Sequence, residues 1–168
     1  MISRPLGVKN KRAVSRWTRT AITVGLLATL PGCASLTPRL ESANGRLPPG
    51  ADGHTVVEVA TRYLGTPYVW GGTGPAGFDC SGFVRYVYGR HGIALPRTVK
   101  DQYRVGVPVS RDRLRPGDIV FFDHLRHNGL YIGNAHLIHA STVDGVVKVA
   151  RLDDDWFRHR WVGARRPL

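Results

Sequence analysis

The sequence lacks several features that would assign a protein to a class at once. It has only two cysteines, Cys33 and Cys80, and therefore at most one disulfide. It has no internal repeat, no low-complexity tract beyond residues 34–52, and neither a basic run with interleaved aromatic residues nor a recognisable nucleic-acid motif. Nucleic acid is therefore not an expected partner, although the formal net charge is +12.

The positive charge is concentrated at the N-terminus. Residues 1–32 hold six of the 24 basic residues and no acid, so the rest of the chain is only modestly basic. A modestly basic body favours anionic surfaces such as wall polymer or lipid headgroups. The apolar segment at 21–30 is about ten residues long, which is too short to span a bilayer and typical of a signal-peptide core.

This segment ends in Leu30-Pro31-Gly32-Cys33, which resembles a bacterial lipobox. The resemblance implies that residues 1–32 are a lipoprotein signal peptide and that Cys33 carries a lipid such as palmitate. Ordinary secretion with an unmodified cysteine is the alternative. No aspartate directly follows the cysteine, which in two-membrane bacteria implies a cell-envelope location at the outer membrane, facing the periplasm. Residues 33–52 are then the lipidated cysteine and a flexible tether.

Lipidation of Cys33 would leave Cys80 as an unpaired thiol in an oxidising compartment, with a disulfide between the two as the competing interpretation. Cys80 follows a glycine-rich loop and precedes an apolar-periodic run, and Asp79 is a natural helix N-cap. The unpaired N–H groups and the helix dipole at such a junction favour a thiolate, so the thiol pKa is expected to fall below about 8.5. Cys80 is thus predicted to be a nucleophile; a buried structural cysteine is the alternative.

Residues 53–168 are predicted to form a single domain. Helical periodicity extends over 54–64 and 81–90, with a short piece at 98–103, and later segments change to a period of two. These later segments are the expected strands, at 119–122, 129–133, 136–140, 146–150 and 161–164. Helices first and strands afterwards, with short connections, indicate an α+β fold in which N-terminal helices pack on a C-terminal antiparallel sheet.

A cysteine nucleophile needs a base, and the base needs a group that orients it. Residues three apart on a strand point to opposite faces, so His136 and His139 should not converge. His127 and His139 converge if the hairpin has a three-residue loop at 133–135, with Ile132 opposite His136. A two-residue loop would place them on opposite faces. In the converging arrangement His127 is the base, and His139 fixes its tautomer.

These residues together resemble the NlpC family of papain-like cell-wall cysteine peptidases. The family's motifs occur in order between about residues 54 and 165. A small departure is Asn128, where the family usually has valine. The matching segments are Tyr68-Val69-Trp70-Gly71-Gly72, Phe78-Asp79-Cys80-Ser81-Gly82-Phe83-Val84, Leu95-Pro96-Arg97-Thr98, 115–122, 127–133 and Leu137-Ile138-His139-Ala140.

The resemblance implies a papain-like fold and hydrolysis of peptide bonds in the stem peptides of peptidoglycan, often next to D-glutamate or diaminopimelate. It implies that Cys80 is the nucleophile, His127 the base and His139 the third polar group. No metal and no cofactor are expected, because the thiolate supplies the nucleophile.

Four further positions match residues near the nucleophile. Tyr68 would help to bind the oxyanion with its hydroxyl, beside the backbone N–H of Cys80. Asp79, Ser81 and Arg97 match positions that line or support the substrate groove. Arg97 would pair with a substrate carboxylate, or else form a surface salt bridge.

The sequence therefore predicts an exported, lipid-anchored cysteine endopeptidase, with peptidoglycan stem peptides and the membrane as partners and no identifiable protein regulator. A non-catalytic wall-binding or scaffolding lipoprotein on the same fold is one alternative. A metal-binding protein is another, because the spacing of four histidines resembles a metal site: His124, His127, His136 and His139. An acyltransferase on a related papain-like scaffold is a more distant third.

Overall fold

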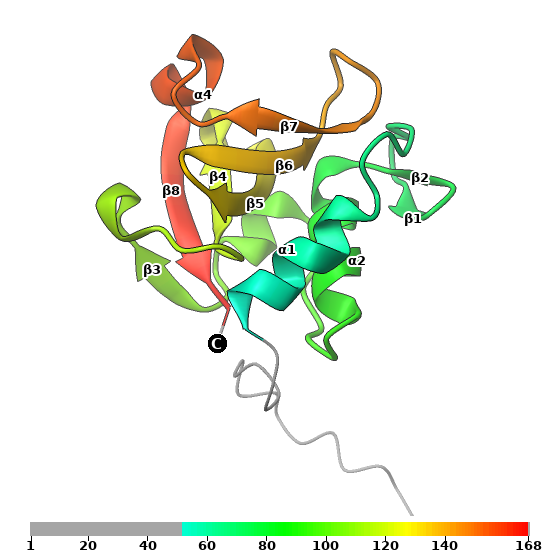
Figure 1. The fold of residues 1–168 in the computed structure, drawn as a ribbon, viewed down its shortest axis with the longest axis horizontal. Helices are drawn as coiled ribbons and strands as arrows, with labels where there is room; N and C mark the ends of the chain where they lie inside the picture. The colour runs from blue at the N-terminus through cyan, green and yellow to red at the C-terminus, as the bar shows by residue number, and fades with distance from the viewer. Residues whose placement is uncertain (1–51, 168) are drawn as a thin grey trace, which may run out of the picture. The chain divides into compact units, whose positions relative to one another are not determined.

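The structure is a computed structural model that describes residues 52–167 (Figure 1). The predicted signal peptide, Cys33 and most of the predicted tether lie outside the described residues. Within the described range, no helix combines the length and the apolar character needed to cross a membrane.

The helices begin where the sequence supplies a capping side chain. Asp52, Asp79 and Thr98 each accept a hydrogen bond from the backbone N–H three residues later, which starts the first three helices. The expected helices near 54–64, 81–90 and 98–103 are therefore confirmed, and a fourth forms after residue 154. The helices of the described residues are α1 (Gly53–Thr61), α2 (Cys80–Gly89), α3 (Val99–Gln102) and α4 (Asp155–His159), with 3₁₀ turns η1 (Arg111–Arg113) and η2 (Asp123–Leu125).

The strands form one antiparallel sheet in the order β3-β8-β4-β5-β6-β7, beside a small separate pair, β1-β2. The five predicted strands all lie in this sheet, as β4 to β8, so the predicted α+β architecture is confirmed. The strands are β1 (Thr73–Gly74), β2 (Gly77–Phe78), β3 (Val107–Val109), β4 (Ile119–Phe122), β5 (His127–Gly133), β6 (His136–Ala140), β7 (Val147–Arg151) and β8 (Trp161–Arg166).

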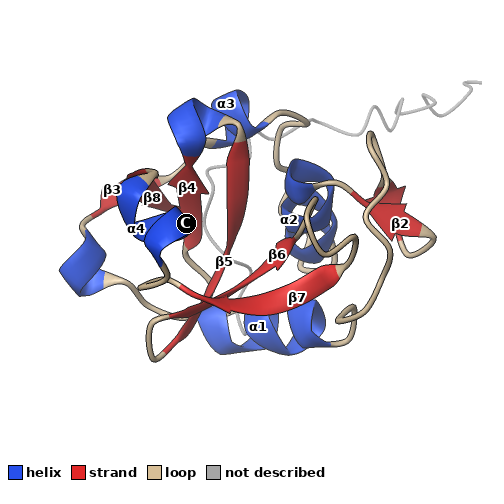
Figure 2. Cartoon of the chain, turned by 90° about the horizontal axis from the view of Figure 1, so that it is seen from above, coloured by secondary structure: helices blue, strands red, loops and turns tan. Residues whose placement is uncertain are grey.

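The sheet separates two apolar clusters. Phe121 packs with the side chains of α1 and α2, whereas its neighbour Phe122 packs with Phe157 of α4, because successive side chains of a strand point to opposite faces. Figure 2 shows α2 and α4 on opposite sides of β5. Helix α2 and the middle of β5 also pack in one apolar cluster, which contains Phe83, Val84 and Leu130.

The turn between β5 and β6 differs from the predicted three-residue loop at 133–135. Gly133 pairs directly with His136, so the turn has two residues, Asn134 and Ala135. Both have positive φ values, 50° and 56°, as the twist-compatible type I′ hairpin turn requires. The predicted loop, and with it the pairing of Ile132 with His136, is wrong.

The register along the hairpin is nevertheless the one that the three-residue loop predicted. The pairing shifts between Tyr131 and Gly133, which leaves Ile132 as an extra, bulged residue on β5. Before this bulge, Tyr131 lies opposite Leu137 and Leu130 opposite Ile138. The bulge thus compensates for the shorter turn and keeps the histidines of the two strands on one face.

Candidate active site

Cys80 is the first residue of α2, and the surrounding sequence explains why the helix begins there. The Asp79 carboxylate accepts hydrogen bonds from the N–H groups of Gly82 (2.7 Å) and Gly71 (3.1 Å). A Cβ atom at Gly82 would lie 2.0 Å from the carbonyl oxygen of Gly72, so only glycine allows the loop to pack against this first turn. The prediction that Cys80 sits at a capped helix N-terminus is confirmed.

His127 and His139 converge from the neighbouring strands β5 and β6. The Nε2 atom of His127 lies 2.9 Å from the Nδ1 atom of His139, and the two rings are nearly perpendicular, at 88°. The convergence expected from the strand register is therefore confirmed. One ring must donate a proton to the other, which fixes the tautomers of both as a linked pair.

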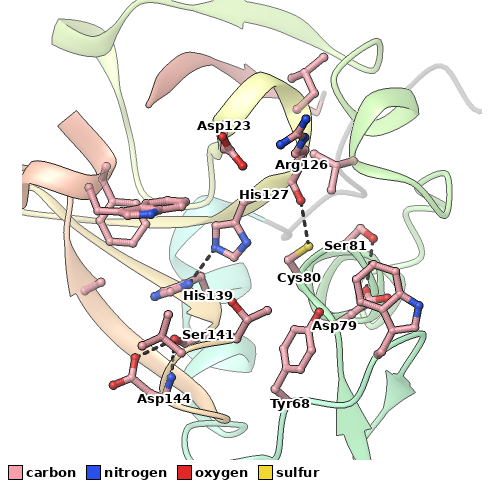
Figure 3. A pocket seen from close by; sticks show the side chains of 18 of the residues that line it. Tyr68, Asp79, Cys80, Ser81, Asp123, Arg126, His127, His139, Ser141 and Asp144 are labelled. Carbon is pink, nitrogen blue, oxygen red and sulfur yellow. Dashed lines mark hydrogen bonds between the residues drawn. The ribbon is translucent and has the colours of Figure 1, made fainter. Parts of the chain in front are cut away.

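The His127 ring lies between Cys80 and His139 (Figure 3). Because Nε2 is engaged with His139, Nδ1 is the ring nitrogen left to exchange a proton with Cys80. Cys80 carries a free thiol, which donates to the backbone carbonyl of Arg126 at 3.8 Å. The Cys80 sulfur thus lies close to the Arg126 carbonyl, and the rings of His127 and His139 line the same cavity.

Burial dominates the protonation of this site. It raises the pKa of the Cys80 thiol, with a further rise from Asp79, while the backbone N–H groups of Ser81, Asn128 and Cys80 act in the lowering direction. Burial also lowers the pKa of His127 to about 4. The expected fall in the thiol pKa is therefore not observed. At neutral pH the site holds a neutral thiol beside a neutral imidazole.

Asp79, Ser81 and Arg97 form one connected group next to the nucleophile. The two terminal nitrogens of Arg97 bind the two carboxylate oxygens of Asp79, and one of them also donates to the Ser81 hydroxyl at 2.8 Å. This is the bidentate geometry expected of Arg97, but its partner is a carboxylate of the same chain. All three side chains line the cavity that contains Cys80.

Tyr68 lies below Cys80 in the view of Figure 3, with its hydroxyl directed toward the sulfur. Its side chain is half-buried, and its pKa is raised by burial and by the nearby Cys80 and Asp79. The phenol therefore stays protonated at neutral pH and keeps a proton to donate. This is the property that an oxyanion-binding hydroxyl needs.

One cavity of about 920 Å³ contains all of these groups, and an aromatic pair forms part of its wall. Trp156 contacts the His127 ring edge-to-face at 5.7 Å between centroids, and Phe157 contacts the His139 ring at 5.2 Å. Sequence reasoning missed both residues. They lie on the short helix α4, which has too few residues to show a periodic pattern.

The four hairpin histidines do not gather into one group. The Nδ1 atom of His136 lies 2.6 Å from the Asn134 carbonyl oxygen, and His124 is exposed on η2. Between residues 52 and 167, no three His, Cys, Asp or Glu side chains are placed to hold a metal ion together.

The sequence pattern of the NlpC/P60 family matches residues 65–166, a range that contains Cys80, His127 and His139. The chain belongs to the NlpC/P60 family. The family resemblance predicted from the sequence motifs is thereby confirmed.

Solved NlpC/P60 structures share the fold. An NlpC/P60 family protein from Bacillus cereus ATCC 10987 has a TM-score of 0.69 at 35% identity, covering 74% of this chain and 42% of that one. The NlpC/p60 domain of the peptidoglycan hydrolase SagA has a TM-score of 0.63 at 35% identity, covering 69% of this chain and 99% of that domain. The papain-like α+β fold is therefore confirmed.

Among proteins of known activity, the chain is similar to the gamma-D-glutamyl-L-lysine dipeptidyl-peptidase of Bacillus cereus. The two are 37% identical over 126 residues, which cover 71% of this chain but only 37% of the relative. The chain thus spans about a third of the length of that enzyme.

Proposed function

We propose that this NlpC/P60 protein is a cysteine endopeptidase that hydrolyses stem-peptide bonds of peptidoglycan and is anchored to the membrane by a lipid on Cys33. The observation that carries the proposal is the arrangement of three side chains in one cavity. Cys80 sits at a helix N-terminus, the His127 ring lies beside it, and His139 lies 2.9 Å from the far nitrogen of that ring.

In the first step, the sulfur of Cys80 attacks the carbonyl carbon of the scissile bond while Nδ1 of His127 takes the thiol proton. Transfer during the attack fits a site in which both groups start neutral. The negative charge moves to the carbonyl oxygen of the tetrahedral intermediate. The backbone N–H of Cys80 and the hydroxyl of Tyr68 are positioned to donate hydrogen bonds to this oxyanion.

The intermediate collapses when the carbon–nitrogen bond breaks, and His127 gives its proton to the departing amine. The acyl part of the substrate remains on Cys80 as a thioester. A water molecule then attacks the thioester carbonyl as its proton passes to His127. Release of the acid returns that proton to the sulfur, so the free thiol is restored.

The proton transfers to and from His127 also determine how the substrate must lie in the cavity. The leaving amine must reach His127, so the part of the peptide beyond the scissile bond lies on the histidine side of the cavity. The acyl part then lies toward Asp79, Ser81 and Arg97. Two similar proteins support a wall peptide as the substrate: SagA is a peptidoglycan hydrolase, and the Bacillus cereus relative is a gamma-D-glutamyl-L-lysine dipeptidyl-peptidase.

The anchor and the location rest on the sequence alone. The lipobox-like Leu30-Pro31-Gly32-Cys33 favours a lipoprotein, and the absence of aspartate after the cysteine favours the outer membrane facing the periplasm. A tethered domain would then meet wall peptides without leaving the membrane surface.

Digestion of purified peptidoglycan, with mass spectrometry of the released fragments, tests the activity. We expect the wild-type chain to release peptide fragments and Cys80→Ala to release none. Cys33→Ala is the matched control, because it removes the other cysteine and the lipid site while leaving the cavity intact. Identical fragment profiles for wild type and Cys80→Ala would refute the proposed reaction and leave a wall-binding protein.

A further inference from the structure

Gln102 on α3 is fully buried and uses both ends of its side-chain amide. Its Nε2 atom donates to the carbonyl oxygens of Ser81 (3.0 Å) and Pro96 (2.9 Å), and its Oε1 atom accepts from Nδ2 of Asn128 at 2.7 Å. Two carbonyl acceptors can be satisfied only by the nitrogen end of Gln102. The orientation of both amides therefore follows from the hydrogen bonds.

These bonds join the two elements that carry the reacting groups. Ser81 directly follows Cys80 at the start of α2, and Asn128 directly follows His127 at the start of β5. Successive side chains of a strand point to opposite faces, so His127 faces the cavity while Asn128 faces the interior. Gln102 thus connects the cysteine helix to the histidine strand from behind the cavity.

Backbone groups of Asn128 and of nearby Arg126 also contact the Cys80 sulfur. The carbonyl of Arg126 accepts the Cys80 thiol proton at 3.8 Å, and the N–H of Asn128 is among the groups that lower the thiol pKa. Fixing the side chain of Asn128 therefore fixes two backbone contacts of the nucleophile as well as the start of His127.

Asn128 contributes to stability with only one end of its side-chain amide. The Asn128 side chain is fully buried, and its Oδ1 atom has no hydrogen-bond partner among the described residues. An unsatisfied buried acceptor costs about 1–3 kcal/mol. Valine, a strong strand former, would remove this acceptor, but it would leave the buried Oε1 atom of Gln102 without the donor that Asn128 supplies. The amide is thus best explained by what its Nδ2 atom holds in place.

We propose that Asn128, acting through Gln102, is a positioning residue that sets the separation between β5 and the N-terminus of α2, and so keeps His127 aligned on the sulfur of Cys80. This inference deepens the proposed function and rests on it for substrate turnover. The reactivity of the thiol toward a small electrophile reports the same alignment without any substrate.

The test compares Asn128→Val, Gln102→Met and the double variant with the wild-type full-length chain. Alkylation of Cys80 by iodoacetamide is followed from pH 5 to 10 by peptide mass mapping, which separates Cys80 from Cys33. The turnover number on peptidoglycan and the melting temperature are measured alongside. Tyr88→Phe is the matched control. Tyr88 lies near the C-terminal end of α2, far along the helix from Cys80, and its hydroxyl donates a buried hydrogen bond to the Gly117 carbonyl that this substitution removes.

We expect Asn128→Val and Gln102→Met each to slow the alkylation of Cys80 at pH 7 about tenfold. The pH profile of alkylation should move by about one unit to higher pH, since a rise of one unit in the thiol pKa lowers the thiolate fraction about tenfold. The turnover number should fall by a similar factor. The double variant should lose no more than either single variant, since one substitution already breaks the link. Tyr88→Phe should lower the melting temperature without moving the alkylation profile.

Unchanged alkylation profiles in Asn128→Val and Gln102→Met would overturn the proposal, as would losses that add in the double variant. If Asn128→Val does not fold, the profile of Gln102→Met decides alone. If the profiles shift as expected while the wild-type chain leaves peptidoglycan intact, the positioning role stands and the proposed function fails.

Discussion

His127 uses both of its ring nitrogens, and this determines where its protons must lie. To take a proton at Nδ1, the neutral ring must carry its own proton at Nε2, from which it donates to Nδ1 of His139 at 2.9 Å. His139 must then be neutral as well. Burial favours this state, lowering the pKa of His127 to about 4 and that of His139 to about 3.

Replacing His139 tests its role as the acceptor of that proton. We expect His139→Ala to lower the turnover number about 100-fold, because the Nε2–H of His127 loses its partner and the ring loses its tautomer and orientation. His139→Gln should recover part of this loss, since its amide oxygen also accepts. Steady-state kinetics on a soluble stem peptide measure both variants. Equal rates for His139→Ala and the wild type would show that His139 does not orient the base.

The pH dependence of activity follows from the same two rings. A base must be unprotonated to act, so activity is lost as the pH falls through the pKa of His127. Because that pKa is lowered to about 4, kcat/KM should persist through weakly acidic pH and fall only near pH 4. An acid limb centred near pH 6.5, the ordinary histidine value, would contradict a buried, neutral base.

At the scale of secondary-structure elements, the first turn of α2 is shaped by one close contact. Gly82→Ala should push the Gly72 carbonyl away and destabilise the protein by about 1–3 kcal/mol, because the added Cβ would lie 2.0 Å from that oxygen. Gly89→Ala on the same helix is the control, since a Cβ there meets nothing within 4 Å. It should leave stability unchanged or raise it by up to about 1 kcal/mol. Urea unfolding of both variants measures the difference, and equal effects would contradict the packing.

The elements with a strong local pattern were predictable from the sequence. Asp79 predicts the start of α2. The apolar run Ile119–Phe122 predicts β4, and the observed strand has the same first and last residues. The bulge at Ile132 was not predictable, because only Gly133 follows it on β5, which is too short a segment to show the shifted alternation. Helix α4 was missed because five residues are too few to show a helical period.

At the scale of the whole molecule, burial decides what the sequence left open. A cysteine after an N-cap predicts a lowered thiol pKa, yet the folded chain partly buries Cys80 and raises that pKa. The local sequence shows that Cys80 lies at a helix N-terminus, but it does not show which distant residues pack against the thiol. The same limit applies to the contact between Asn128 and Gln102, which joins residues far apart in the chain.

The buried histidines also link folding to pH. Their pKa values are lower in the folded chain than in the unfolded one, so the stability they permit is present above about pH 6.5 and is lost as the pH falls toward 4. The free energy of unfolding should drop by up to about 1.4 kcal/mol per pH unit for each histidine in this window. Urea unfolding from pH 7 to 4.5 measures the slope. A flat response, or the same slope in His127→Gln/His139→Gln, would contradict it.

The proposed reaction requires Cys80 to form a covalent thioester with the acyl part of a wall peptide. Mixing the protein with a soluble stem peptide, quenching in acid within milliseconds and mapping the Cys80 peptide by mass spectrometry tests it most directly. We predict a transient mass increase on Cys80 equal to the acyl fragment, appearing before free product and absent in His127→Ala. Product formation without any adduct on Cys80, or undiminished cleavage by Cys80→Ala, would contradict the account.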